Sequence, residues 1–424
     1  MTTHVTLGEL DQRSEPIELT SEVATALADT ELVDVRPQGN GRWLLVPRGR
    51  VGAVRINDLQ VQVIPKEKVG LTRLLFLLGY ASDPGFLATT ADDVEAVEEP
   101  DLWPALAEAL TRLIERALLH GVLQGYRTVD EATRTVRGRI RISDQIARRP
   151  GILIPLEVSY DDYTVDTSEN RILRSALRRM MSVPGISEKI QIRLAHLDRK
   201  LDDVTVIDRG EALPHWQPSR LNFRYQPALR LAEIVLRNAS AEAGPGGLHV
   251  AAFVVEMWRV FEDFVTTALT DSLRRRYRGT SIAQYPSFLD EPSVGAKTGK
   301  VKLLIDLVHL TNEIPRIIFD AKYKVASPGG KYPNADHYQM LAYCTALQLR
   351  TAWLVYAAGR DQLAEHRVVH TDVTVMVYPL DLSASPYALL EQIDRLVDCA
   401  ARCAISQDAS QSLEFSSQEP VQRA

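Results

Sequence analysis

The pattern of hydrophobic and polar residues near the start of the chain predicts a region rich in β-strands. Three short, mostly apolar runs lie between residues 42 and 65, separated by turn-forming residues: RWLLVP, VGAVRI and LQVQVIP. Runs of this length and pattern predict half-buried strands. A leucine-rich helix is expected over residues 71–81, and the acidic stretch 92–101 is expected to be an exposed connector. We therefore predict a β-rich N-terminal domain over residues 1–100.

Beyond residue 100 the apolar residues recur every three or four positions, which is typical of amphipathic helices. Helices are predicted at residues 102–120, 170–181, 186–201 and 221–236. Two runs between the first and second helix, TVRGRIRI and ILIPLEVSY, favour strands instead. The glycine-rich stretch 243–247 is typical of a linker, so we predict that a mainly helical middle region, residues 101–243, ends there.

After this stretch the order becomes helix, strand, strand, helix, strand, which predicts a C-terminal α/β domain over residues 248–406. Its first helix, VVEMWRVFEDFVTTALTDSL, has Val255, Trp258, Phe261 and Val265 at the spacing of a buried face. The runs KLLIDLVHL, RIIFDAKYK and TAWLVYAA predict strands, and a last helix is expected at 388–403. The polar residues 407–424 are predicted to be a disordered tail. The predicted fold class is α+β with several domains.

Composition narrows the class of protein. The chain has 424 residues, of which 45% are hydrophobic and 25% charged, as in soluble proteins of two or three domains. The net charge of -6 argues against a protein that coats nucleic acid by bulk charge, but it does not exclude a nuclease. The N-terminus lacks a secretory signal pattern, and no apolar run reaches the roughly 18 residues of a membrane span. We therefore expect a cytosolic protein without a membrane partner.

Two strand candidates carry charges at positions that point to chemistry. Asp306 lies within one strand, and Asp320 and Lys322 lie two residues apart in the next, so the latter two side chains share one face. Adjacent antiparallel strands would bring Asp306 and Asp320 side by side. Two carboxylates suffice to hold Mg²⁺ against a scissile phosphate, and a lysine could orient or help to deprotonate the attacking water. This pattern predicts phosphodiester hydrolysis.

Other interpretations stay open beside this one. An Asp-x-Lys triplet is also typical of a solvated surface hairpin. A zinc site built on His309 and His337 would need further ligands, which the sequence does not supply. The acidic residues 160–166 favour a loop before the helix at 170, with Ser168 as its N-cap, over a second metal site.

The order of the elements resembles the PD-(D/E)xK nuclease superfamily. A helix with Glu262 precedes the strand of Asp306 and the Asp-x-Lys strand, and the following helix carries Gln339 and Tyr343 four residues apart. This resemblance implies that Asp306, Asp320 and Glu262 bind Mg²⁺, with Mn²⁺ as the alternative ion. It also implies that Lys322 assists the water, and that Gln339 and Tyr343 support the substrate or the lysine.

A narrower resemblance covers most of the chain. The segments VGAVRINDLQVQVIPK, TVRGRIRISDQI, YDDYTVDTSENRILRSAL, LNFRYQPALRLAEIVL, VEMWRVFEDFV, FDAKYK and HYQMLAYC, in this order, are similar to the McrC family, the nuclease subunits of McrBC restriction systems. The resemblance implies DNA cleavage in a modification-dependent (5-methylcytosine type) system and an AAA+ GTPase partner of the McrB type, engaged and stimulated by the N-terminal domain. Two alternatives remain: a non-catalytic regulator of such a GTPase, and a standalone DNA-repair nuclease.

Overall fold

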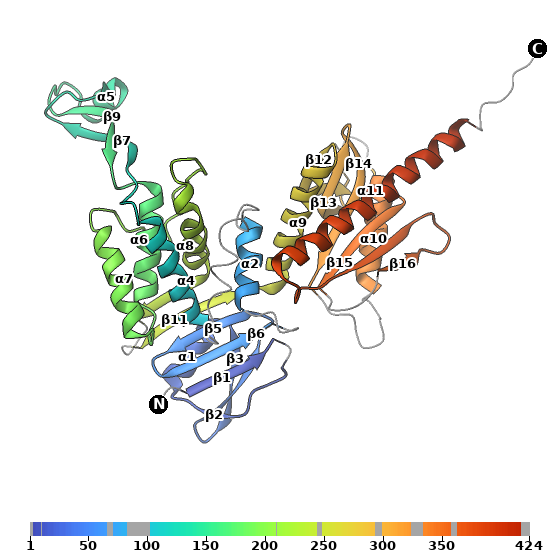
Figure 1. Cartoon of the computed structure of the whole chain (residues 1–424), viewed down its shortest axis with the longest axis horizontal. Helices are drawn as coiled ribbons and strands as arrows, with labels where there is room; N and C mark the ends of the chain where they lie inside the picture. The colour runs from blue at the N-terminus through green and yellow to red at the C-terminus, as the bar shows by residue number, and fades with distance from the viewer. Residues whose placement is uncertain are drawn as a thin grey trace, which may run out of the picture.

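A computed structural model describes residues 3–9, 11–65, 71–82, 102–208, 210–243, 248–292, 299–323, 334–357 and 363–416. The chain combines several sheets with helices between and around them, so the mixed α and β content predicted from the sequence is confirmed (Figure 1). Within these residues, no helix combines the length and the apolar character that a membrane span requires. The predicted acidic connector, residues 92–101, lies outside the described residues.

The N-terminal part forms two sheets. The larger sheet has the order β1-β6-β5-β11-β10, with β1 parallel to β6 and the other pairs antiparallel. The smaller sheet has the order β2-β4-β3, and helix α1 packs beside it. The bounds are β1 Thr3–Gly8, β2 Ile17–Glu18, α1 Ser21–Asp29, β3 Val33–Gly39, β4 Arg42–Pro47, β5 Val51–Ile56, β6 Leu59–Ile64, β10 Ala239–Ala243 and β11 His249–Val255. The three strands predicted between residues 42 and 65 are confirmed as β4, β5 and β6.

The domain boundary predicted at residues 243–247 does not separate two sheets. Strands β10 and β11 flank this stretch and pair antiparallel, with Ala243 opposite His249. Strand β11 also pairs along its length with β5, so it completes the N-terminal sheet. A glycine-rich stretch between two paired strands looks the same in sequence as a linker between domains, because only the distant partner β5 distinguishes them. The division predicted between residues 243 and 248 is therefore corrected: the C-terminal region begins after β11.

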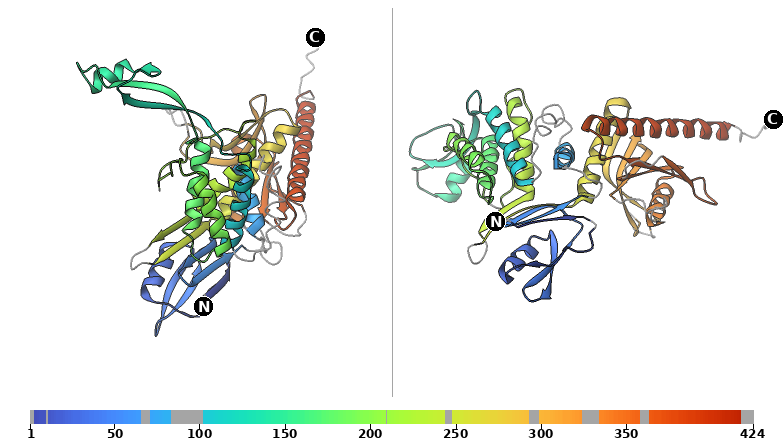
Figure 2. Two further views of the ribbon diagram at one scale, coloured as in Figure 1. Left: turned by 60° about the vertical axis from the view of Figure 1, so that its left-hand side comes forward. Right: turned by 60° about the horizontal axis from the view of Figure 1, so that its bottom comes forward.

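The middle region is a helical bundle from which a β-arm projects. The bundle contains α4 Leu102–Ala117, α6 Ser168–Met181, α7 Glu188–Lys200, the short 3-10 helix η3 Phe223–Tyr225 and α8 Gln226–Asn238, which confirms the predicted helical character. The arm consists of β7 Gly125–Thr133, β8 Arg139–Ile140, α5 Ile142–Arg148 and β9 Leu156–Thr164 (Figure 2). Of the predicted strand TVRGRIRI, residues 135–142, only β8 forms, because the exposed arm buries no face of this run and the chain enters α5 at residue 142.

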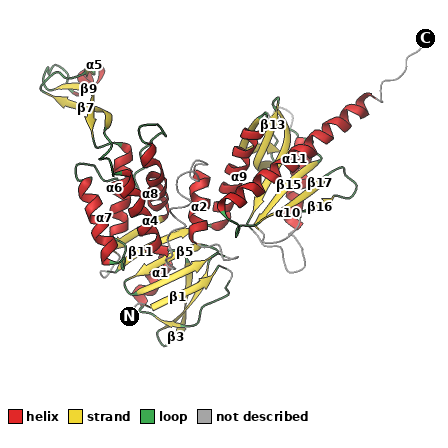
Figure 3. Ribbon diagram, viewed as in Figure 1, coloured by secondary structure: helices red, strands yellow, loops and turns green. Residues whose placement is uncertain are grey.

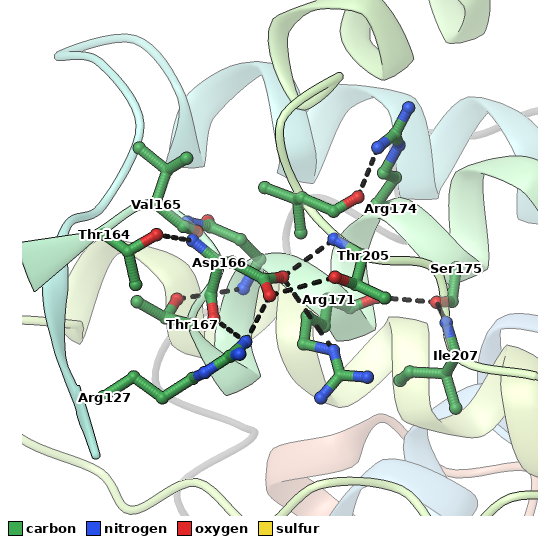
Figure 4. Close-up of polar contacts among 12 residues, drawn as sticks. Arg127, Thr164, Val165, Asp166, Thr167, Arg171, Arg174, Ser175, Thr205 and Ile207 are labelled. Atoms are coloured by element: carbon green, nitrogen blue, oxygen red, sulfur yellow. Dashed lines mark hydrogen bonds and ion pairs between the residues drawn. The ribbon is translucent and has the colours of Figure 1, made fainter. Parts of the chain in front are cut away.

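Asp166 fastens the arm to the bundle. It follows β9 and accepts hydrogen bonds from Thr205 N at 2.7 Å and Thr205 Oγ1 at 2.9 Å, and its carboxylate also contacts Arg127 of β7 (Figure 4). Arg171 of α6 lies 3.9 Å away. The cap of α6 is Thr167, whose side chain accepts from Asn170 N, so the prediction of Ser168 as the cap is wrong by one residue. Asp166 of the acidic stretch thus links the β-arm to the helical bundle, and we call its contacts with Thr205, Arg127 and Arg171 the Asp166 joint.

The C-terminal region is a six-stranded sheet of order β12-β13-β14-β15-β17-β16 between helices. Helices α9 and α11 pack on one face and α10 packs on the other (Figures 1 and 3). The bounds are α9 Met257–Arg276, β12 Thr280–Phe288, β13 Lys302–Thr311, β14 Ile314–Lys322, α10 Asn334–Leu347, β15 Thr351–Ala357, β16 Ala364–Arg367, β17 Thr374–Leu380 and α11 Pro386–Ser416. Residues 407–416, predicted to be disordered, continue α11, since helix-permitting residues follow one another there without Pro or Gly.

Helix α9 joins this region to the N-terminal part through helix α2, Leu71–Ser82. Phe264 is fully buried, and its ring centroid lies 5.7 Å from that of Phe76 and 5.6 Å from that of Tyr80, both on α2. Phe261 and Val265 are buried as predicted, whereas Trp258 is 50% exposed, so its predicted place in the core is wrong. The apolar face of α9 is instead continued by residues such as Val260.

Gly52 is required where β5 meets β11. Its φ is +150°, and a Cβ at this position would lie 1.8 Å from the carbonyl oxygen of Phe253. We predict that Gly52→Ala forces the two strands apart and lowers the free energy of unfolding by about 1–3 kcal/mol, the usual cost of strained backbone. Urea denaturation measures this. An unfolding free energy equal to that of the unsubstituted protein would contradict the prediction.

The Asp166 joint predicts a pH dependence. Burial raises the pKa of Asp166, but the hydrogen bonds from Thr205 and the charges of Arg127 and Arg171 outweigh it and hold the pKa below its usual value. A carboxyl with a depressed pKa contributes stability that is present above about pH 4 and is lost as the pH falls through the folded-state pKa.

We therefore expect Asp166→Asn to lower the free energy of unfolding by about 1–3 kcal/mol at pH 6, and by less at pH 3. Urea denaturation at the two pH values measures both differences. Asp161→Asn is the matched control, because Asp161 lies on the exposed arm and accepts a bond from Thr128. A penalty of equal size at both pH values would rule out the ionic contribution of the joint.

Candidate active site

The hairpin of β13 and β14 brings Asp306 and Asp320 together, as predicted. A two-residue turn joins the strands, and its residues, Asn312 and Glu313, have φ values of 50° and 65°. Such left-handed turns match the twist of paired strands and fix their register. Leu307 pairs with Phe319, and the next step of this register sets Asp306 beside Asp320.

The two carboxylates are buried and incompletely satisfied. Asp320 is 1% exposed and Asp306 is 9% exposed. Asp306 Oδ2 accepts a hydrogen bond from Ala321 N at 2.9 Å, and Asp320 Oδ2 lies 2.6 Å from Lys322 Nζ. Asp320 Oδ1 has no hydrogen-bond partner among the described residues. A buried anion without full pairing is costly, so the arrangement points to a site that receives a positive group.

The pKa values of the two carboxyl groups also indicate a site that receives a positive group. Burial and, after it, the neighbouring charge of Asp306 together raise the pKa of Asp320 to about 7, against the lowering effect of Lys322. Burial likewise raises the pKa of Asp306, against the Ala321 amide and Lys322. For Lys322, burial lowers the pKa, but the attraction of Asp320 and Asp306 outweighs it and raises the pKa. One ammonium thus faces two crowded carboxylates, which would hold their charges more readily with a second cation present.

Glu262 lies at the edge of this cluster on α9. It is half-buried and accepts a hydrogen bond from Gln284 Nε2 at 2.8 Å. Burial raises the pKa of Glu262, and the negative charge of Asp306 raises it as well. Among the described residues, no three His, Cys, Asp or Glu side chains lie close enough to form a metal-binding group. Asp306 and Asp320 are therefore the two oxygen donors that the structure brings together, with Glu262 further out.

Two carboxylates fit a magnesium ion. Mg²⁺ takes few protein ligands, keeps several waters and prefers carboxylate oxygens. The unpaired Oδ1 of Asp320 supplies such a donor beside Asp306. Within the described ranges, His309 and His337 do not share a metal-binding group: His309 contacts Ser281 Oγ at 2.9 Å and the Arg278 carbonyl at 3.2 Å, and the ring of His337 lies against His366.

Gln339 and Tyr343 form a hydrogen-bonded chain that ends on strand β13 and does not reach Lys322. Gln339 Nε2 donates to Tyr343 Oη at 2.6 Å, and Tyr343 Oη donates to the Leu304 carbonyl at 2.8 Å. These bonds fix α10 against β13 two residues before Asp306. Within the described part of the chain neither side chain is hydrogen-bonded to Lys322, so their contribution to the site is through β13.

Asp336 is a buried carboxylate that the sequence reasoning missed. It lies in the first turn of α10, is 3% exposed, and accepts a hydrogen bond from Tyr356 Oη at 2.5 Å. Its charge contributes to the raised pKa of Asp320. The sequence feature that could have indicated Asp336 as a site residue is its spacing. Asp336 lies three residues before Gln339, which places both on the same side of α10.

The chain resembles known proteins in sequence and in fold. A family model described as "McrBC 5-methylcytosine restriction system component" matches residues 45–357. A chain of a Thermococcus gammatolerans assembly, described as McrB AAA+ hexamers with bound McrC, superposes with a TM-score of 0.57 at 16% identity, covering 93% of this chain and 99% of that one. A second structure, the McrBC complex of the same organism, matches at a TM-score of 0.39 and 19% identity, over 65% and 90% of the two chains. No curated protein matches the sequence.

Proposed function

Because the chain belongs to the McrBC family of 5-methylcytosine restriction system components, we propose that it is the DNA-cleaving subunit of such a system. The observation that carries this proposal is the buried group of Asp306, Asp320 and Lys322. Two carboxylates side by side, one with an unpaired oxygen and both with raised pKa values, suit a divalent cation far better than they suit a structural role.

Each residue has a role that its surroundings support. Asp306 and Asp320 would hold Mg²⁺, or Mn²⁺ in its place, and Glu262 would orient a water molecule. When bound, the ion lowers the pKa of water and offsets charge on the phosphate oxygens. Lys322 is partly exposed and keeps its proton, so its ammonium can stabilise negative charge on the phosphate undergoing hydrolysis.

The remaining residues position this group. Gln339 and Tyr343 hold β13, and Asp336 holds α10 against β15 through Tyr356. The proposed reaction is hydrolysis of a DNA phosphodiester bond, in which the chain supplies carboxylates, a lysine and a site largely closed to bulk water. No covalent intermediate with the protein is required.

We further propose that the chain works with an AAA+ GTPase of the McrB type. Support comes from the similar structure, which is described as McrB AAA+ hexamers with bound McrC. The match covers 93% of this chain and 99% of that one. In this proposal the chain stimulates GTP hydrolysis, and the GTPase partner would recognise the modified base.

We predict that Asp320→Ala and the isosteric Asp320→Asn each reduce Mg²⁺-dependent plasmid cleavage by about a thousandfold or more, since several kcal/mol of transition-state stabilisation is lost. Asp372→Asn, an exposed loop residue, is the matched control and should cleave normally. Removing Mg²⁺ with EDTA should abolish cleavage, and adding it back should restore cleavage. Full cleavage by both Asp320 variants would refute the assignment of the site.

The proposed partner is tested by repeating the cleavage assay with and without an AAA+ GTPase of the McrB type and GTP. Cleavage that requires both supports the restriction subunit, and cleavage without them supports a standalone nuclease. If GTP hydrolysis is accelerated but no condition gives cleavage, the chain is a non-catalytic regulator, and the proposed nuclease activity fails.

A further inference from the structure

Strand β13 departs from regular alternation at Asp306. Leu307 belongs to the apolar core that contains the buried residues of α9, whereas Ile305 belongs to the core that contains those of α10. Side chains two residues apart in a regular strand point to the same face of the sheet. Because Ile305 and Leu307 lie on opposite faces, the strand changes face at the residue between them, which is Asp306.

Gln284 is the residue of β12 at the same level. The residue before it pairs with Leu307 and the residue after it pairs with Ile305, and in these described strands the ladder skips the level between the two pairs. Gln284 has a φ of 49°, in the left-handed region. This conformation costs free energy in residues other than glycine, and it persists where the surrounding structure determines it. The register therefore sets a strained Gln284 opposite Asp306.

The side chain of Gln284 reaches helix α9. Its Nε2 donates a hydrogen bond to Glu262 Oε1 at 2.8 Å. Glu262 is half-buried, and no other described residue donates a hydrogen bond to its carboxylate. Gln284 thus adjoins Asp306 through the register of its strand and Glu262 through its side chain. It is the residue that connects the two carboxylates across the edge of the sheet.

A purely structural role explains this arrangement poorly. Gln284 is exposed on β12, an edge strand of the sheet. A hydrogen bond there contributes modestly to folding, since water satisfies the same groups in the unfolded chain. Glycine would adopt the same φ without strain. Strained residues and interrupted ladders occur preferentially next to active sites, where they re-aim a side chain.

We propose that Gln284 is a positioning residue that holds Glu262 beside Asp306. By donating to Oε1, its amide fixes the Glu262 side chain and leaves Oε2 to accept a hydrogen bond from the water molecule that Glu262 orients. A neutral donor suits this task, because a cationic one would compete with the metal ion for the carboxylate. The proposal rests on the nuclease function proposed above, and it adds a residue that acts through Glu262 without contacting the DNA.

The test uses Gln284→Met, which keeps the length of the side chain and loses the donor. Under the conditions in which the unsubstituted protein cleaves plasmid DNA, its kcat should fall about ten- to a hundredfold, the usual effect of removing a hydrogen-bonded neighbour of a metal-site group. Its KM for DNA should stay the same. In the Glu262→Gln background the substitution should have no further effect, because Gln284 acts through Glu262. A further fall in the double variant would contradict this.

Gln348 provides the matched control. It is an exposed glutamine with a φ of 55°, and it follows the last turn of α10. Gln284→Gly and Gln348→Gly each relieve a left-handed backbone, so neither should lower the midpoint of urea denaturation. Cleavage should fall in Gln284→Gly and stay normal in Gln348→Gly. If Gln284→Gly instead lowers the midpoint and leaves cleavage normal, Gln284 is a structural residue and the proposal fails.

Binding of Mn²⁺ alone, measured by calorimetry on the full chain without DNA, separates this proposal from the nuclease function. Gln284→Met should weaken Mn²⁺ binding about tenfold, and Gln348→Gly should not change it. If the unsubstituted chain binds Mn²⁺ but never cleaves, the nuclease function fails, and weaker binding in Gln284→Met still supports the positioning role. Unchanged Mn²⁺ affinity and unchanged cleavage in Gln284→Met would overturn that role alone. A chain that neither binds Mn²⁺ nor cleaves DNA would overturn both proposals.

Discussion

The packing of Phe264 against α2 is the interaction on which the arrangement of the chain depends. Helix α9 contacts α2 on one side and the strands β12, β13 and β14 on the other. Phe264 is fully buried, and its ring packs against the rings of Phe76 and Tyr80 on α2. Because α9 also carries Glu262 and follows directly from β11, one helix fixes the edge of the active site and the N-terminal sheet relative to one another.

The active site is a local departure from the rule that buried charges are paired. The central residues of β13 and β14, 305–308 and 317–321, are apolar apart from Asp306 and Asp320, and the hairpin places these two carboxylates and Lys322 together. The folding free energy lost there is offset by the surrounding apolar core, which includes Leu307, Phe319 and Trp353. Such an arrangement is stable enough to persist while leaving carboxylate oxygens available to a ligand.

Much of this could be predicted from sequence, for identifiable reasons. The pair Asp306 and Asp320 follows from strand periodicity and a short turn, which are local properties. Asp336 was missed because burial of a polar helix residue depends on Tyr356, a residue of another strand. Trp258 was placed in the core because helical spacing alone does not show which residues of an amphipathic helix the neighbouring elements cover. The glycine-rich stretch at 243–247 was read as a linker because its strand partner lies far away in sequence.

That distant pairing also sets the order in which the protein can form during synthesis. Strand β5 emerges from the ribosome early, but its pairing with β11 cannot be completed until Val255, the partner of Val51, has been synthesised. At ribosomal rates the edge of β5 stays open for roughly 10–40 seconds. An unpaired, apolar edge is a template for wrong pairing. The nascent chain is therefore expected to depend on chaperone protection of β5 until the helical bundle and β11 have been made.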